Sequence, residues 1–205
     1  MNSTPHPERR RVLRSLAQAA AVTQIGGPLS VLAQPQSLPL TPACGAPAHA
    51  TAEQTEGPYF KRSSPLRQSL LQEGMPGERL QLGGRVVDMQ CRPIANALLD
   101  FWQADTNGAY DNQTFRLRGH QFSDASGAFR LETVLPGLYP GRTRHIHVKV
   151  QAPGGRVLTT QLYFPGEAAN RGDAIFSAAL RVALQRDASG ARAAFDFVLE
   201  ARPIS

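Results

Sequence analysis

Short apolar runs separated by turn-forming residues make up most of the chain from about residue 80 onward. Alternation of apolar and polar residues with period two is typical of a strand with one buried face. Clusters of Asp, Gly and Pro between such runs are typical of the turns that join strands. Strands at this spacing favour a β-sandwich or barrel, so we expect a mainly β fold, a β-sandwich. The expected strands cover residues 80–87, 97–103, 128–132, 144–151, 157–163 and 193–199.

Two further elements complete the expected fold. Residues 174–184 carry apolar side chains at helical spacing, which predicts one short helix. Residues 34–54 are rich in Pro, Ala and Thr, which predicts an extended N-terminal arm. The predicted organisation is therefore a leader over residues 1–33, an arm and linker over residues 34–79, and one β-sandwich domain over residues 80–205 that carries the candidate catalytic residues.

The first 33 residues have the pattern of an export leader. A basic cluster over residues 8–14 is followed by a mostly apolar stretch that ends in Ser30-Val-Leu-Ala33, a plausible cleavage point. Two arginines, a spacer and two apolar residues resemble the twin-arginine leader, so we expect removal near Ala33 and a periplasmic or secreted protein. The alternative is an amphipathic N-terminal helix that the mature protein keeps. A membrane span is not expected, because Gln, Gly and Pro interrupt the apolar stretch.

The net charge of +6 at first suggests a nucleic-acid partner. The first 33 residues hold four arginines against one glutamate, a net charge of +3. The remaining residues carry 18 basic and 15 acidic groups, which is also only +3. A nucleic-acid-binding protein keeps a basic stripe in its folded part, so we expect no nucleic-acid partner.

The two cysteines of the chain are Cys44 and Cys91. In an oxidising compartment an even pair favours one disulfide, and two buried free thiols are the alternative. Two cysteines are too few for a thiolate metal site.

A pair of histidines, His145-Ile-His147, lies within an expected strand. With period two, both imidazoles point to one face about 7 Å apart along the strand, which lets them converge on one metal ion. Such a pair alone is more often a surface or core feature. Arg142 and Arg144 lie beside it, which would oppose a simple divalent cation and suggests that something anionic also binds there.

Two tyrosines sharpen the metal hypothesis. Tyr110 lies in a polar loop after the strand that ends near Trp102, and Tyr139 lies just before the histidine pair. Together with the histidines they make a candidate set of two nitrogen and two oxygen ligands. Phenolate suits a hard, highly charged ion such as Fe(III), and ionising a tyrosine at pH 7 costs about 4 kcal/mol, which a trivalent ion can supply. Zinc would more usually take His, Cys or carboxylate ligands.

At this point the sequence resembles the intradiol ring-cleavage dioxygenase family, in particular the exported relatives of protocatechuate 3,4-dioxygenase. The resemblance runs over residues 55–166 and rests on ordered motifs. These are Thr55-Glu-Gly-Pro-Tyr59, Cys91-Arg-Pro-Ile94, Trp102-Gln-Ala-Asp105 with Gly108-Ala-Tyr110, Arg118-Gly119, Pro136-Gly-Leu-Tyr139, Arg142 with His145-Ile-His147, and Thr160-Gln-Leu-Tyr-Phe164.

The resemblance implies one non-haem Fe(III) per chain, held by four side chains. Tyr110 and His147 would be the equatorial ligands, and Tyr139 and His145 the axial ones. It further implies that a catechol binds the iron through both hydroxyls, displaces Tyr139, and is opened by O2 to a muconate-type diacid. Arg142 falls on the family's active-site arginine and would stabilise charge on the ring.

The resemblance also suggests which residues surround the substrate. Gln161 falls on a glutamine that faces the substrate. Gly57, Pro58 and Tyr59 are candidates for the pocket wall, with ordinary packing as the alternative for Tyr59. Gly141 stands where the protocatechuate enzyme has a bulky aromatic residue, which would open the pocket and leaves the ring substituents unassigned. Assembly into a homo-oligomer is left open.

Two alternatives remain at the level of the sequence. One is a β-sandwich binding module without enzymatic activity, since fold does not give function. The other is a divalent-metal enzyme that uses the histidine pair and takes a carboxylate ligand from Asp105 or Asp111.

Overall fold

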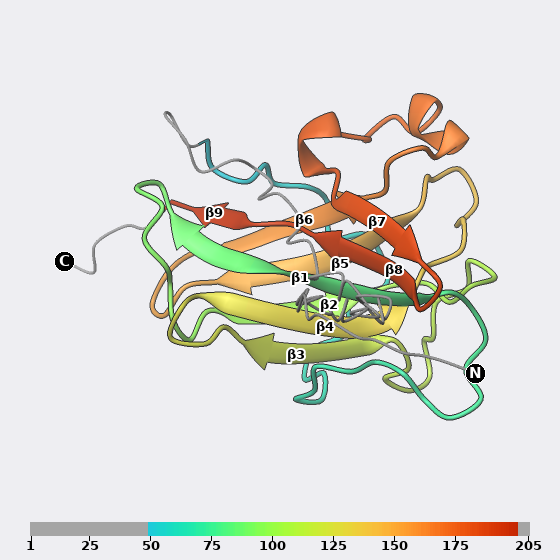
Figure 1. Ribbon diagram of the computed structural model, residues 1–205, viewed down its shortest axis with the longest axis horizontal. Coiled ribbons are helices and arrows are strands. Elements are labelled where there is room, and N and C mark those ends of the chain that lie inside the picture. Colours follow the sequence, from blue (N-terminus) through green and yellow to red (C-terminus); the bar gives the residue numbers. More distant parts are fainter. Residues whose placement is uncertain (1–48, 201–205) are drawn as a thin grey trace, which may run out of the picture. The chain divides into compact units, whose positions relative to one another are not determined.

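Two β-sheets enclose a hydrophobic core in the computed structural model, which describes residues 49–200 (Figure 1). All of these residues belong to one compact unit. The first sheet has the order β4 (Ala128–Val134), β1 (Arg79–Asp88), β8 (Gly190–Ala194) and β7 (Ala183–Asp187), with β9 (Phe197–Leu199) beside the second part of β1. The second sheet is antiparallel throughout, in the order β3 (Arg118–Phe122), β2 (Leu98–Trp102), β5 (His145–Gln151) and β6 (Val157–Tyr163). The expected mainly β sandwich is confirmed.

The alternation along β5 shows how the sequence builds the core. Ile146, Val148 and Val150 face inward and are fully buried. They belong to the same core cluster as Leu82 and Leu131 of the first sheet. The alternate residues of β5 face the opposite side of the sheet, and they include His145 and His147. We call that side the outer face.

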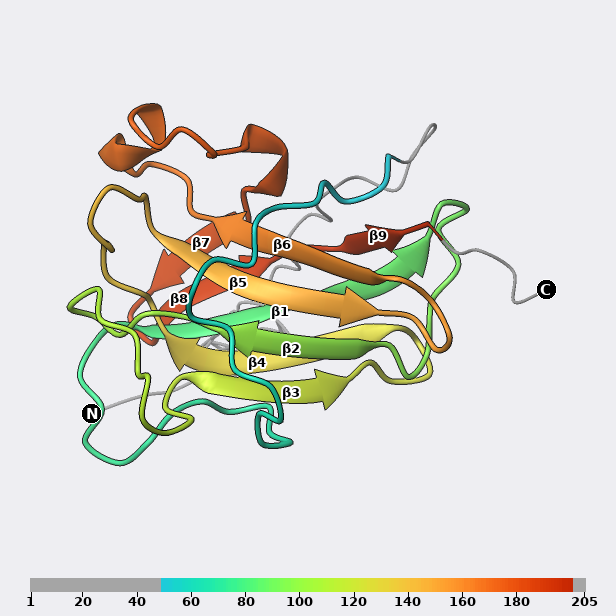
Figure 2. The same ribbon diagram turned by 180° about the vertical axis from the view of Figure 1, so that it is seen from behind.

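An extended segment, residues 51–71, crosses the outer face and is called the strap below (Figure 2). At one edge the Gln54 N–H donates to the Thr159 carbonyl of β6, at 2.8 Å. At the other edge the Arg67 N–H donates to the His120 carbonyl of β3, at 2.9 Å. The described part of the predicted arm and linker is therefore hydrogen-bonded to both edges of the second sheet.

The segment expected as one strand over residues 193–199 forms two strands, β8 and β9. Both pair in parallel with β1, and the chain shifts between them at Phe195 and Asp196. The Arg85 N–H donates to the Asp196 carboxylate at 2.8 Å, and the Phe195 N–H donates to the Gly83 carbonyl at 3.0 Å. A Cβ at Gly84 would lie 1.9 Å from the Phe195 carbonyl oxygen, so this crossing requires glycine.

The prediction of a helix over residues 174–184 is wrong. That segment holds a single 3₁₀ turn, η2 (Ala178–Leu180), and then enters β7. The Ile175 carbonyl accepts the Tyr163 hydroxyl at 3.0 Å, and the Val182 N–H donates to the Tyr163 carbonyl at 2.9 Å. These tertiary bonds take up backbone groups that a helix would need for itself. A second 3₁₀ turn, η1 (Ala168–Arg171), and the short strand β3 were not anticipated.

Several predictions concern residues outside the described part of the chain, namely the leader over residues 1–33, its cleavage near Ala33, and Cys44. Cys91 is disulfide-bonded.

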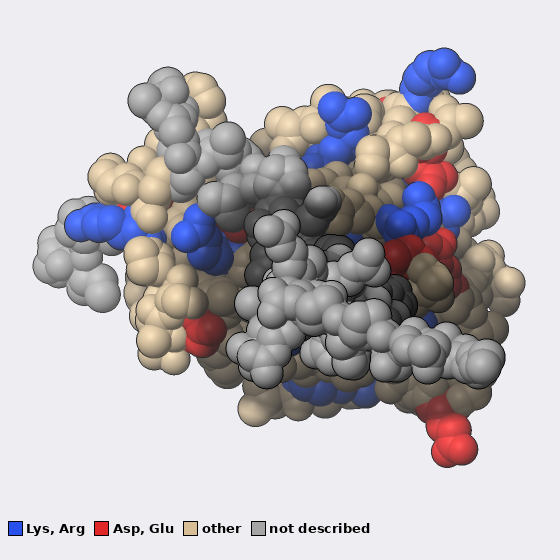
Figure 3. Space-filling model, viewed as in Figure 1, with Lys and Arg blue, Asp and Glu red and all other residues tan. Residues whose placement is uncertain are grey.

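Within residues 49–200, no helix is long and apolar enough to cross a membrane. On the coloured part of the face in Figure 3, basic and acidic side chains are interspersed.

Candidate metal centre and active site

Strand register brings the candidate residues into one row across the outer face. Trp102 of β2 lies opposite Arg118 of β3 and opposite His147 of β5. His147 in turn lies opposite Gln161 of β6. In the neighbouring row, His145 lies opposite Tyr163. Trp102 and His147, 45 positions apart in the sequence, are thus direct neighbours because the antiparallel strands share one register.

The two histidines converge as the period-two pattern predicts. Their Nε2 atoms face each other at 3.2 Å, and both side chains are at least 96% buried. His145 Nδ1 lies 2.6 Å from the Thr143 carbonyl, which can only accept, so Nδ1 carries the proton and Nε2 keeps its lone pair. Trp102 stacks on the His147 ring with centroids 4.8 Å apart.

Burial sets the charge state of this pair. Desolvation lowers the pKa of His145 to about 4 and lowers the pKa of His147 well below its ordinary value. The nearby Arg142 guanidinium acts in the same direction on both. Both imidazoles are therefore neutral at pH 7, which is the form that binds a metal ion.

Tyr110 completes a cluster of three donor atoms. Its hydroxyl oxygen lies 3.1 Å from His145 Nε2. Burial raises the pKa of the Tyr110 phenol, while the positive charges of Arg142 and Arg118 act to lower it. Ionisation of this phenol near pH 7 would thus require a further positive charge at the site.

Tyr139 lies next to this cluster but its hydroxyl has a different partner. Its ring packs edge-on against Tyr110, with centroids 5.8 Å apart. Its hydroxyl shares a hydrogen bond of 2.8 Å with the hydroxyl of Tyr59. The structure therefore brings all four predicted metal ligands together, with the Tyr139 oxygen hydrogen-bonded to the strap.

Glycines in the two tyrosine motifs explain how the loops approach each other. A Cβ at Gly108 would lie 2.0 Å from the Leu138 carbonyl oxygen. A Cβ at Gly137 would lie 2.4 Å from the Gly108 nitrogen. Any side chain at either position would push apart the loops that carry Tyr110 and Tyr139, which accounts for Gly108-Ala-Tyr110 and Pro136-Gly-Leu-Tyr139 as motifs.

The strap supplies the residues predicted for the pocket wall. Gly57 has φ of +70°, and a Cβ there would lie 3.5 Å from His147 Cε1, so the strap backbone covers the imidazole. Pro58 is exposed. Tyr59 stacks on Tyr110 with ring centroids 4.3 Å apart and an angle of 10° between the planes. Tyr59 is thus part of the tyrosine cluster.

Arg142 is held rigidly beside the cluster. Its Nε donates to the Asp173 carboxylate at 2.9 Å, and a terminal nitrogen donates to the Gln161 side-chain oxygen at 2.6 Å. Gln161 in turn donates to the Thr55 carbonyl of the strap at 2.9 Å. The Tyr163 hydroxyl donates to the Ile175 carbonyl at 3.0 Å and lies 3.4 Å from Arg142. Arg142 and Gln161, both predicted, therefore belong to one hydrogen-bonded network.

Sequence reasoning missed Asp173 as part of the site. This carboxylate is 93% buried and accepts both the Arg142 side chain and the Thr143 N–H, each at 2.9 Å. Burial raises its pKa, but the bonds from Thr143, Ile175 and Arg142 outweigh burial and keep the pKa below its usual value. It lies 31 positions from Arg142, and no local pattern marks it.

The cluster fits a metal ion of the kind the sequence suggests. Donor atoms bound at about 2.1 Å to one ion lie about 3.0–3.4 Å apart, and the Tyr110–His145 and His145–His147 spacings are 3.1 and 3.2 Å. Within residues 49–200, His147 Nδ1 is buried and has no hydrogen-bond partner. Among the described residues, no group of three or more His, Cys, Asp or Glu side chains comes together. The donors here are imidazoles and phenols, a set suited to Fe(III).

The carboxylates of the divalent-metal alternative are engaged elsewhere. Asp105 accepts the N–H groups of Asn107 and Ala109 and pairs with Arg116 at 2.8 Å. Asp111 accepts backbone N–H groups within its own turn, from residues 113, 114 and 116. Neither carboxylate is a ligand for the histidine pair, so this alternative is not favoured.

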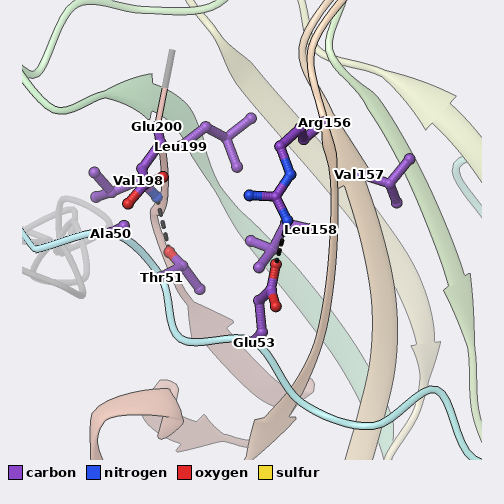
Figure 4. A pocket seen from close by; sticks show the side chains of 9 residues that line it. All are labelled: Ala50, Thr51, Glu53, Arg156, Val157, Leu158, Val198, Leu199 and Glu200. Atoms are coloured by element: carbon purple, nitrogen blue, oxygen red, sulfur yellow. Dashed lines mark hydrogen bonds and ion pairs between the residues drawn. The ribbon is translucent and has the colours of Figure 1, made fainter. Parts of the chain in front are cut away.

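A separate hollow lies beside the first residues of the strap, and none of the site residues lines it (Figure 4). Its polar groups are an exposed ion pair between Glu53 and Arg156 at 3.9 Å and the Thr51 side chain, which accepts the Val198 N–H at 2.8 Å. Nothing in this hollow matches the chemistry of the tyrosine–histidine cluster.

Comparison with known proteins agrees with this arrangement. A family model described as Dioxygenase matches residues 55–201. The chain is 33% identical over 140 residues to the protocatechuate 3,4-dioxygenase beta chain of Burkholderia cepacia, which covers 59% of this chain and 60% of that protein. It is 30% identical over 183 residues to 6-chlorohydroxyquinol 1,2-dioxygenase of Cupriavidus pinatubonensis, with 75% of this chain and 66% of that protein covered. The chain spans 57% of chlorocatechol 1,2-dioxygenase of Rhodococcus opacus and 48% of catechol 1,2-dioxygenase of Acinetobacter baylyi.

Solved structures show the same fold. The dioxygenase domain of a dioxygenase carbohydrate-binding protein fusion from Streptomyces sp. SirexAA-E is 55% identical, with a TM-score of 0.74 over 75% of this chain and 100% of that one. 3-Chlorocatechol 1,2-dioxygenase from Rhodococcus opacus is 28% identical, with a TM-score of 0.69 over 74% of this chain and 73% of that one. Since the family model matches more than half of its residues, the chain belongs to the intradiol ring-cleavage dioxygenase family.

Proposed function

We propose that this protein opens a catechol-type ring between its two hydroxyls with O2, at one non-haem Fe(III) per chain, and releases a muconate-type diacid. The observation that carries the proposal is the convergence of Tyr110, His145 and His147 at hydrogen-bond distance, with Tyr139 packed against Tyr110. A binding module has no need to combine these side chains. The relatives named as catechol, chlorocatechol and hydroxyquinol dioxygenases support the same reaction class.

The four predicted ligands would hold the iron as two imidazoles and two phenolates. When bound, Fe(III) would supply a Lewis acid that lowers the pKa values of both catechol hydroxyls and makes the ring reactive toward O2. The neutral state of His145 and His147 prepares them for this role. The two phenolates would be anionic oxygen ligands, which suit a hard, highly charged ion such as Fe(III).

Of the two tyrosines, Tyr139 would be the one that takes up a proton from the substrate, as a general base does. The Tyr59 hydroxyl already shares a hydrogen bond with the Tyr139 hydroxyl, so the released phenol would have a partner in place. Tyr110 instead contacts His145, which suits a ligand that stays bound.

Arg142 would stabilise the negative charge that develops on the ring. A cation does this well when it is fixed in advance. Asp173 and Gln161 fix the guanidinium through bonds of 2.9 and 2.6 Å. Gln161, Gly57, Pro58 and Tyr59 would surround the substrate.

The test is an anaerobic titration of the iron-loaded protein with catechol, a chlorocatechol, hydroxyquinol and protocatechuate. Fe(III)–phenolate absorbs visible light, so the purified protein should be red to burgundy, and the absorption should shift as each substrate binds. Admission of O2 should then give the muconate-type product, identified by mass. A colourless protein with stoichiometric zinc and no activity on adding iron would contradict the proposal. A ring opened outside the two hydroxyls would contradict the reaction class.

We also propose that the protein is exported, on the basis of the leader pattern in residues 1–33. A disulfide at Cys91 is compatible with an oxidising compartment. The intact mass of the protein recovered from outside the cytoplasm of its native host should lack about the first 33 residues. A mature mass that still includes them would count against export.

A further inference from the structure

Arg118 is a buried cation next to the site, and neither the ligand set nor the proposed reaction uses it. Its side chain is 99% buried on the outer face of β3, beside Trp102. Its hydrogen bonds all end on backbone carbonyls. Nε and a terminal nitrogen donate to the Asp111 carbonyl at 3.2 and 2.8 Å, and the other terminal nitrogen donates to the Tyr59 carbonyl. Burying a guanidinium is unfavourable unless its donors are satisfied, so this placement calls for an explanation.

The two carbonyls belong to the two segments that meet at the tyrosine stack. Tyr59 lies on the strap, and Asp111 directly follows Tyr110. The rings of Tyr59 and Tyr110 stack at 4.3 Å. The Tyr59 hydroxyl bonds to Tyr139, and the Tyr110 hydroxyl bonds to His145. One guanidinium therefore holds the backbone on both sides of the stack whose hydroxyls meet the other predicted ligands.

The residue next to Arg118 lets the strap turn back onto the same strand. A Cβ at Gly119 would lie 2.8 Å from the Arg67 side chain and 2.9 Å from the Leu70 side chain. Arg67 donates through Nε to the Arg118 carbonyl at 2.9 Å. Arg67 thus ties the strap to β3 but has no hydrogen bond to the tyrosine pair, which makes it a matched control.

We propose that Arg118 is a positioning residue for the tyrosine cluster. By holding the carbonyls of Tyr59 and Asp111 it keeps the two rings stacked, and so keeps the Tyr110 hydroxyl beside His145. The consequence for the reaction rests on the proposed function, whereas the positioning itself is a property of the protein without metal.

The composition of the chain offers reporters for this test. The chain has four tyrosines and one tryptophan, and all five side chains lie at the site. NMR of metal-free protein with ring-labelled tyrosine therefore observes only the site. The visible absorption of the iron-loaded protein and its kcat and KM give two further measurements.

The full chain is compared with Arg118→Met, Arg118→Lys and Arg67→Met. We expect Arg118→Met to shift or broaden the ring signals of Tyr59 and Tyr110, to weaken and shift the visible band, and to lower kcat about 10- to 100-fold, as outer partners of metal ligands do. Arg118→Lys should recover part of each property, since it keeps the charge and can bond one carbonyl. Arg67→Met should lower Tm but leave the tyrosine signals and the visible band unchanged.

The inference is overturned if Arg118→Met shows wild-type tyrosine signals, or the same signals as Arg67→Met. Should Arg118→Met not fold, the lysine variant decides: because its ammonium can bond only one of the two carbonyls, wild-type tyrosine signals would overturn the inference. Should the wild-type protein bind no iron, the proposed function fails, while the metal-free NMR comparison still tests the positioning.

Discussion

The two faces of the four-stranded sheet use the same strands for different purposes. On β5 the inward residues Ile146, Val148 and Val150 are fully buried in the core. The outward residues His145 and His147 are almost as deeply buried, yet what covers them is the strap and the tyrosine loops. Burial on the inner face comes from sheet packing, and burial on the outer face comes from a crossing segment. Changes on the inner face should therefore affect stability, and changes on the outer face should affect chemistry.

The largest expected effect is on turnover, from Tyr139→Phe on the outer side. Iron should stay bound, because three protein ligands remain and water can fill the gap. Turnover should fall about 100- to 10,000-fold, because the residue can no longer take up a substrate proton. The measurement is kcat together with iron content and Tm. Normal turnover would show that Tyr139 is not the proton acceptor, even if the iron site is right.

On the inner face, Ile146 lies between the two histidines in the sequence. The substitution Ile146→Ala tests whether a change on this face lowers stability and leaves the metal site unchanged. Loss of a fully buried isoleucine side chain should lower the free energy of unfolding by about 2–5 kcal/mol. The visible band of the surviving folded protein should stay at the wild-type wavelength. Denaturant unfolding and the absorption spectrum check the two parts. A large band shift would mean that the core directly sets the geometry of the metal site.

Arg142→Leu should leave iron and colour intact and slow only the step with O2. Removing one preorganised electrostatic contact of this kind raises the barrier by about 3 kcal/mol. The control is Arg144→Leu, which removes a neighbouring arginine with different partners. Arg144 pairs with Glu167 at 2.9 Å and donates to the Pro136 carbonyl. The rate after mixing the substrate complex with O2 should fall for the first variant and stay near wild type for the second. Equal rates for both would remove Arg142 from the mechanism.

The sequence was sufficient where the physics is local or repetitive. Period-two alternation located six strand segments and placed His145 and His147 on one face, and ordered motifs indicated Tyr110, Tyr139, Arg142 and Gln161. It failed over residues 174–184, because apolar residues at helical spacing also suit an irregular segment whose backbone groups bond to Tyr163. It could not show that the strap covers His147, since a crossing held by backbone hydrogen bonds leaves no mark on side-chain pattern. Asp173 was missed for the same reason, as a long-range partner.

The smallest expected effect comes from Phe122→Ser, on the outer face beyond the strap. Phe122 lies on β3, four residues after Arg118, and is 49% exposed. Because about half of the Phe122 side chain is already exposed and its ring packs edge-on against His120, the free energy of unfolding should fall by about 1 kcal/mol or less. Iron content, visible band and kcat should equal those of the wild type, in contrast to Arg118→Met on the same strand. Size-exclusion chromatography of the wild type and of Phe122→Ser is the control. If the substitution dissociates an assembly that the wild type forms, this end of the face is an interface between copies of the chain. The exposed fraction of Phe122 in a single chain would then not predict the effect of the substitution.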